Sequence, residues 1–169
     1  MKLLQGYVEN STVAISLTAI FSALFVATRP LVIPIAPGVV IAICGSFLYL
    51  TPLFLPWKYT WVLPFLVAYT GSSPIRNFIT VTAGTQTCYF TSRLLSKTMR
   101  FQVLSTILAT YVTNMVGSIV RHLMGTTPIA IGFPACMVKA TVTAASLLII
   151  VPVIIEALKA TGVVNFEES

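Results

Sequence analysis

The segment TAIFSALFVATRP (residues 18–30) is apolar almost throughout and ends abruptly in an arginine and a proline. Proline has no backbone N–H and restricts the residue before it, so we expect a helix to end there. Small side chains recur at every fourth position of this helix, at Ala19, Ala23 and Ala27. They form one line along the helix, here called the alanine strip, against which another helix can pack closely. That helix can belong to this chain, which is the more common case, or to another protein.

The whole chain has the composition of a membrane protein. Of its 169 residues, 57% are hydrophobic and only 8% are charged, and the mean hydropathy is +0.95, which is more apolar than a soluble domain allows. A bilayer core of about 30 Å requires about 20 apolar residues per helix, so the length allows about six short spans. We therefore predict an all-α integral membrane protein, a compact bundle of about six transmembrane helices that forms one domain over residues 1–169.

Apolar runs and the breakers between them predict where these spans lie. They cover residues 12–28, 39–55, 57–69, 76–95, 101–123 and 135–158. The third span is short and contains Pro64; if it were re-entrant, the two termini would lie on opposite sides of the membrane. Between the first two spans, PLVIPIAPG (residues 30–38) has too many prolines for a helix and is too apolar for an exposed loop. We expect it to fold back on the protein as a lid or a short plug.

Basic residues orient the bundle. With the N and C termini both cytoplasmic, the inner side carries Lys2, Lys58, Arg93, Lys97, Arg100 and Lys159. The outer side then carries Arg29, Arg76 and Arg121, with Lys139 near the outer end of the last span. This excess follows the positive-inside rule. The N-terminal MKLLQGYVEN contains polar residues and no cleavage motif, so we interpret it as a cytoplasmic tail rather than a secretory signal.

The residues that most intramembrane enzymes need are missing from the predicted spans. The acidic residues lie in the tails or at the end of the last span: Glu9, Glu156, Glu167 and Glu168. His122 is the only histidine, and the cysteines Cys44, Cys88 and Cys136 are widely spaced, as core residues are. We therefore expect no catalytic site, no metal site and no cofactor. A proton-coupled pump is also disfavoured, although His122 and Lys139 can titrate.

Polar residues recur at helical spacing in three of the predicted spans. The stripes are Asn77, Thr80, Gly84 and Thr87; Thr110, Asn114, Gly117 and Arg121; and Lys139, Thr143 and Ser146. In lipid such stripes must face protein or a water-filled cavity, so they indicate either interhelical hydrogen bonds or a pocket that opens outward. The predicted polar rim of that pocket is Arg29, Arg76, Asn77, Asn114, Arg121, His122 and Lys139. Arginine and lysine without an acid suit a carboxylate, a phosphate or an electron-rich ring, whereas each alone can also be a headgroup anchor.

Four features together point to a known family. They are the short chain of about six helices, ALFVA (residues 23–27) with its A-x-x-x-A spacing, the apolar linker RPLVIPIAPG (residues 29–38), and the final FPACMVKATVTAASLLIIVPVIIEALK (residues 133–159). In these the chain resembles the substrate-binding S component of energy-coupling factor (ECF) vitamin transporters. The resemblance covers the whole chain, but it contains no motif that is diagnostic of a substrate.

The resemblance implies a function in uptake across a prokaryotic cell membrane. An S component holds a vitamin or related micronutrient in an outward pocket under the loop after the first helix. It docks on a transmembrane coupling subunit through its alanines, here Ala23 and Ala27, and two partner ATPases drive its toppling in the membrane. This chain has no G-x-x-x-x-G-K-[ST] motif and cannot hydrolyse ATP itself. The lack of buried carboxylates argues against cationic vitamins and metal ions and favours an anionic or aromatic vitamin.

Two other functions fit the same residues. One is a small multi-pass scaffold or assembly subunit without a ligand, in which the alanine strip binds a partner helix and the polar stripes only pack. The other is a stand-alone secondary transporter, whose halves would be expected to show matching interruptions. The prolines at 30, 34 and 37 match those at 128 and 134 only loosely.

Overall fold

The computed structural model describes residues 8, 10–36, 39–70, 73–95 and 98–162. Within them six α-helices account for most of the residues, which agrees with the expected helical class, but only three of the six are long and apolar enough to cross a membrane. The six helices are α1 (Ser11–Thr28), α2 (Leu50–Phe54), α3 (Val62–Thr70), α4 (Pro74–Leu94), α5 (Met99–Leu123) and α6 (Ile129–Ala160). Two strands, β1 (Val32–Ala36) and β2 (Val39–Ala42), and two 3₁₀ turns, η2 (Ile43–Ser46) and η3 (Trp57–Tyr59), complete it.

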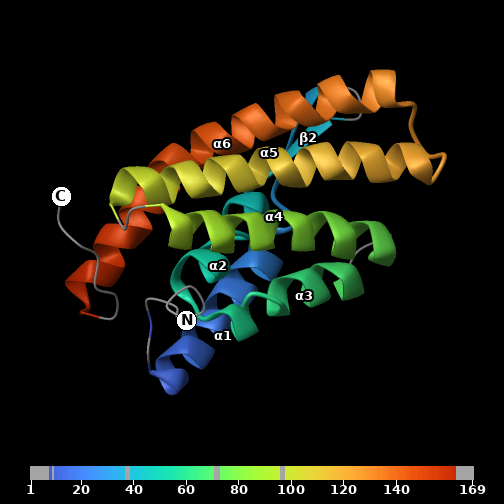
Figure 1. Ribbon diagram of the computed structural model, residues 1–169. Coiled ribbons are helices and arrows are strands. Elements are labelled where there is room, and N and C mark those ends of the chain that lie inside the picture. Colours follow the sequence, from blue (N-terminus) through green and yellow to red (C-terminus); the bar gives the residue numbers. More distant parts are fainter. Residues whose placement is uncertain (1–7, 9, 37–38, 71–72, 96–97, 163–169) are drawn as a thin grey trace.

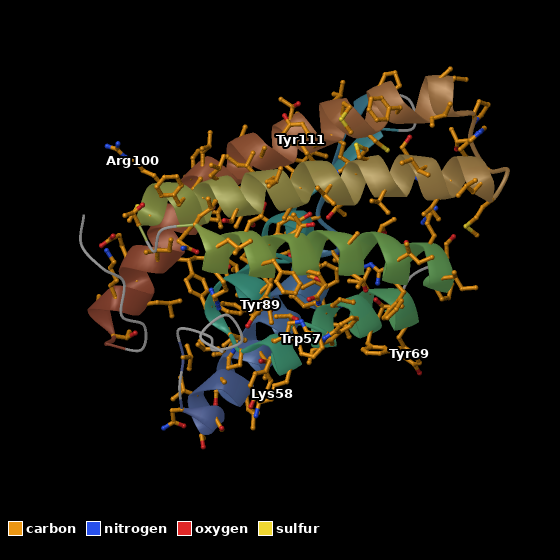
Figure 2. All side chains as sticks on the ribbon, viewed as in Figure 1. Trp57, Lys58, Tyr69, Tyr89, Arg100 and Tyr111 are labelled. Carbon is orange, nitrogen blue, oxygen red and sulfur yellow. The ribbon has the colours of Figure 1, made fainter. Side chains whose placement is uncertain are left out.

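The helices α4, α5 and α6 run side by side, and α1, α2 and α3 pack on the other side of α4 (Figure 1). Successive helices from α3 to α6 run in opposite directions. The start of α1 and the end of α6 lie at the same end of the bundle (Figure 1). Tyr111 links α5 to α6 through a 3.0 Å hydrogen bond between its hydroxyl and Oγ1 of Thr141 (Figure 2). The layers place α5 between α4 and α6.

The helices α1, α5 and α6 are long and apolar enough to cross a membrane. On α5 the large apolar side chains are exposed, among them Phe101, Leu104, Leu108, Met115 and Ile119. Its polar side chains are buried instead: Gln102, Ser105, Thr106, Thr110 and Ser118. Water-soluble proteins rarely expose such a continuous apolar face, so this inverted distribution is compatible with a membrane protein.

Local signals account for the ends of α1. Oδ1 of Asn10 accepts hydrogen bonds from the backbone N–H groups of Thr12 at 2.9 Å and Val13 at 3.4 Å, so Asn10 is an N-cap. The helix ends at Thr28, before Arg29 and the proline, as predicted. The expected spans at 76–95 and 101–123 are also helices, as α4 and α5, with ends that differ by one or two residues.

The expected span at 39–55 is not one helix. Its β-branched run VVI pairs instead with the proline-containing segment before it, in an antiparallel hairpin in which Ile33 lies opposite Ile41. Pro34 cannot donate to a ladder and lies beside the register shift of β1, where a missing N–H is tolerated. In the hairpin, backbone N–H and C=O groups of one strand bond to those of the other. A helix could not satisfy these groups in a segment with so many prolines. The segment 30–38 is thus joined to the bundle through β2, which pairs with β1 and contacts α6. That it acts as a lid or a plug stays a prediction, and positions 37 and 38 lie outside the described residues.

The third and sixth expected spans differ in length from the helices observed. Residues 57–69 form only η3 and the short α3, in whose first turn Pro64 removes an N–H that has no helical partner. Helix α6 begins at Ile129 rather than at residue 135 and continues through Pro134. That proline removes one hydrogen bond, to the carbonyl of Ala130 in the first turn, so the helix is not interrupted.

Gly84 allows α4 and α5 to approach closely. A Cβ at this position would collide with Oγ1 of Thr113 and would lie 3.2 Å from the carbonyl oxygen of Ala109. One turn of α5 further on, a Cβ on Gly117 would lie 3.4 Å from Cγ2 of Thr80. The two contacts fix the antiparallel register of α4 and α5.

We expect Gly84→Ala to lower the free energy of unfolding by about 1–3 kcal/mol, because the added methyl group overpacks the interface. Gly117→Ala is the matched control, since its Cβ meets only an ordinary contact, and we expect little change or a small gain. Thermal unfolding of the protein in detergent measures both. Equal stability of the two variants would contradict the close contact at Gly84.

Candidate functional site

A cavity of about 240 Å³ lies among α4, α5, α6 and the segment from η2 to Tyr49. All four members of the stripe on α5 line the cavity: Thr110, Asn114, Gly117 and Arg121. The stripe on α4 contributes Asn77 and Thr80, and the stripe on α6 contributes Lys139 and Thr143. The remaining member of the α6 stripe, Ser146, packs elsewhere and lies 2.9 Å from Ser46, oxygen to oxygen. Some residues of the stripes thus line a cavity and Ser146 packs against Ser46; that the cavity opens outward stays a prediction.

The cavity has a charged end and a neutral end. Extending the register set by Gly84 and Thr113 places Arg76, in the first turn of α4, level with Arg121, in the last turn of α5. Lys139 lies one turn of α6 beyond Cys136, whose Sγ is 3.9 Å from Nη1 of Arg121. Thr110 lies about three turns from Arg121, or about 16 Å along α5. One end therefore gathers three positive charges, and the other carries hydroxyl groups.

The positive charges at the charged end have no acidic partner in the cavity. Arg121 repels both Arg76 and Lys139. None of the residues that line the cavity is acidic. The acidic side chain within the described ranges, Glu156, is exposed and pairs with Lys159 at 3.4 Å.

Several donors at the charged end are not used within the protein. Nε of Arg121 is buried without a hydrogen-bond partner among the described residues. Among the described residues, the ammonium group of Lys139 also makes no hydrogen bond or ion pair. Arg76 donates from Nε and Nη2 to the neutral Oδ1 of Asn77, at 3.3 and 3.1 Å. An anion could accept from all three side chains.

The neutral end is built from a chain of hydroxyl groups. The buried Tyr49 donates from its hydroxyl to Oγ1 of Thr113 at 2.8 Å, and Thr113 donates to the carbonyl of Ala109 at 2.9 Å. Nδ2 of Asn114 donates to the carbonyl of Thr110 at 2.8 Å, so this amide is turned toward its own helix. These groups can orient a ligand without adding charge.

Five of the seven predicted rim residues line the cavity: Arg76, Asn77, Asn114, Arg121 and Lys139. His122 follows Arg121 in α5, is rotated about 100° from it around the helix, and is exposed instead. Arg29 follows α1 and does not line the cavity. Its positive charge interacts electrostatically with the thiol of Cys44, which does line it. That any of the seven binds a substrate stays a prediction.

Sequence analysis missed seven wall residues: Gly45, Leu48 and Val81, and four that carry a hydroxyl or thiol group, Tyr49, Thr113, Cys44 and Cys136. Cys136 is three positions before Lys139 and Thr113 is adjacent to Asn114, so helical spacing could have identified both. Tyr49 and Cys44 lie in an apolar segment without regular spacing, and the sequence carries no comparable signal for them.

The alanine strip is exposed along its length, at Ala19, Ala23 and Ala27. The opposite face of α1 packs into the core through Ala14, Leu17, Phe21 and Phe25. Among the described residues, no other helix of this chain covers the strip. The more common case, packing within the chain, is therefore not what the structure has.

Comparison of the chain with protein-family models, with curated proteins and with solved structures gave no match. The fold and the cavity define a helical bundle with an apolar exterior and a cation-lined interior site.

We expect Lys139→Met to raise the stability of the protein without a ligand, by about 0.5–2 kcal/mol, because it removes a repelled and unpaired charge. The exposed Arg100, at the start of α5, provides the control Arg100→Gln, which should leave stability unchanged. Thermal unfolding in detergent measures the difference. A lower stability of Lys139→Met would mean that the ammonium group makes a stabilising contact.

Proposed function

We propose that the chain is the membrane-embedded substrate-binding subunit of an ATP-driven uptake transporter for a vitamin-type micronutrient in a prokaryotic cell membrane. It binds a small anionic or aromatic molecule in the cavity among α4, α5 and α6. The observation that carries this proposal is the group of three cations, Arg76, Arg121 and Lys139, in a cavity without any acid.

The charges favour a ligand site over simple packing. Partly buried charges are ordinarily paired, because removing an uncompensated charge from water is costly. Interhelical packing would need only the hydroxyl groups, such as those of Tyr49 and Thr113. Cations that repel one another lower the stability of the protein. A bound anion that compensates their charge would explain why the chain carries them.

The direction of the cavity fits uptake. Its charged end lies at the start of α4 and the end of α5, opposite the start of α1 and the end of α6 (Figure 1). With both termini cytoplasmic, as the positive-inside rule favours, that end faces outward. An outward site with a high positive potential would concentrate anions from outside the cell.

The assignment to a transporter with separate ATPases is supported by the alanine strip and by the resemblance to ECF S components. A small-residue strip in lipid permits close helix packing, and here that surface is available to another protein. The chain carries no G-x-x-x-x-G-K-[ST] motif. The partners proposed for coupling to ATP, a transmembrane coupling subunit and two ATPase subunits, are those that the resemblance implies.

We expect affinity purification of the tagged protein in mild detergent from its native host to recover a membrane coupling subunit and ATPases. Ala23→Trp should lose them, because its indole fills the strip. Leu108→Trp is the matched control: it adds the same side chain at an exposed apolar position of α5 and should retain the partners. Recovery of the chain alone, or with the same unrelated membrane proteins from all three forms, would reject the transporter subunit.

We expect the purified protein to bind at least one member of a panel of vitamins saturably, and Arg121→Ala to weaken that binding at least tenfold. The reason is the loss of a charge-assisted hydrogen bond, about 1.5–3 kcal/mol. Isothermal titration in detergent measures the affinity, and thermal unfolding verifies that the variant is folded. Unchanged affinity in folded Arg121→Ala would place the ligand outside the cavity.

A further inference from the structure

We infer that the ligand of the cavity carries two negative charges at one end, as a dicarboxylate or a phosphate monoester does, and an uncharged, hydrogen-bonding body at the other. This inference rests on the proposed function, in which the cavity is the binding site. It narrows the ligand from anions or aromatic molecules in general to dianions.

The first step is the balance of charge. Arg76, Arg121 and Lys139 contribute three positive charges to one cavity, and none of its lining residues is acidic. A monoanion would leave two of these partly buried charges uncompensated. A dianion leaves only one positive charge of the site uncompensated. A dianionic group such as a phosphate is also small enough for the cavity.

The second step is the supply of donors. Nε of Arg121 and the ammonium group of Lys139 have no hydrogen-bond partner among the described residues, and the guanidinium of Arg76 contacts only the amide oxygen of Asn77. Guanidinium groups bind carboxylates and phosphates through paired parallel hydrogen bonds. By the register of Gly84 and Thr113, Arg76 and Arg121 lie level on α4 and α5, and both line the cavity, so they can hold two sides of one dianionic group.

The third step is the shape of the rest of the cavity. Beyond the cations the walls are the hydroxyl groups of Tyr49, Thr110, Thr113 and Thr143, with the apolar side chains of Leu48 and Val81. These walls suit a neutral body with few polar atoms. The volume of about 240 Å³ lies below the range of about 300–1,000 Å³ for sites of drug-sized ligands, so the ligand is small.

The cysteines offer a reporter of what occupies the charged end. Cys136 lies beside Arg121 there, and Cys44 is in the same wall. Cys88 is fully buried against Tyr49 and does not line the cavity. In the background Cys44→Ser and Cys88→Ser, Cys136 is the only remaining thiol, and it is 5% exposed in the wall of the cavity.

The test measures the rate at which anionic methanethiosulfonate ethylsulfonate modifies Cys136 in the full chain, purified in detergent at constant ionic strength. Succinate, its monoamide succinamate and its neutral diamide succinamide have nearly the same size and differ in charge; inorganic phosphate tests the other dianion class. We expect succinate or phosphate to slow the reaction at a concentration at least tenfold lower than succinamate, and succinamide to have no effect. Equal potency of succinamate and both dianions, or no slowing by any probe, would overturn the inference.

Variants locate the effect. Arg121→Gln and Lys139→Gln should each reduce the advantage of the dianion at least threefold; Lys139→Gln keeps the test usable if Arg121→Gln does not fold. Arg100→Gln is the matched control, because Arg100 extends away from the bundle at the far end of α5 (Figure 2). An equal loss in Arg100→Gln would mean that the selectivity comes from net charge and not from the cavity.

The outcome is separate from that of the partner purification. Selective protection of Cys136 by dianions without ATPase partners would keep this inference and reject the transporter. Recovery of the partners with no charge selectivity at Cys136 would do the opposite.

Discussion

The close antiparallel contact between α4 and α5 at Gly84 is the constraint on which the candidate site depends. Without a side chain at this position the two backbones approach until Thr113 and the carbonyl of Ala109 fill the space. This contact sets the register, and the register brings the first turn of α4 against the last turn of α5. Arg76 and Arg121, which are distant in sequence, are neighbours for that reason.

On α5 the polar and apolar residues are distributed in the opposite sense to a helix of a soluble protein, with polar side chains buried and large apolar ones exposed. Threonine and serine side chains on α4 and α5 are buried and return hydrogen bonds to carbonyls of their own helices, as Thr85, Thr106 and Thr110 do. On the same helices, leucine and isoleucine side chains such as Ile79, Leu104 and Leu108 are exposed. Such internal satisfaction is what a hydrocarbon environment requires, because no water is available to accept or donate. Among the described residues a few buried groups lack a partner, among them the hydroxyls of Thr82 on α4 and Ser118 on α5 and, in the cavity, Nε of Arg121.

Much of the cavity could be predicted from the sequence, because a helix converts spacing into a shared face. The α5 stripe from Thr110 to Arg121 lines the cavity in full. The same reasoning failed for His122, which is adjacent in sequence but points in another direction, and it could not reach Tyr49, which enters through a segment that is not a regular helix. The division of residues 39–55 into β2, η2 and α2 was also not predicted. A short apolar run is compatible with either strand or helix, and only its pairing with β1 decided it.

By itself the sequence determined the helical class, the ends of α1 and the residues that share each polar face, since these follow from composition, from caps and breakers, and from the 3.6-residue period. Tertiary structure decided which faces meet. It turned the alanine strip outward, although packing within the chain was the more common expectation, and it joined three separate cations into one cavity. Both outcomes depend on the register and rotation of packed helices, which are set by contacts between residues far apart in the chain, such as Gly84 with Thr113.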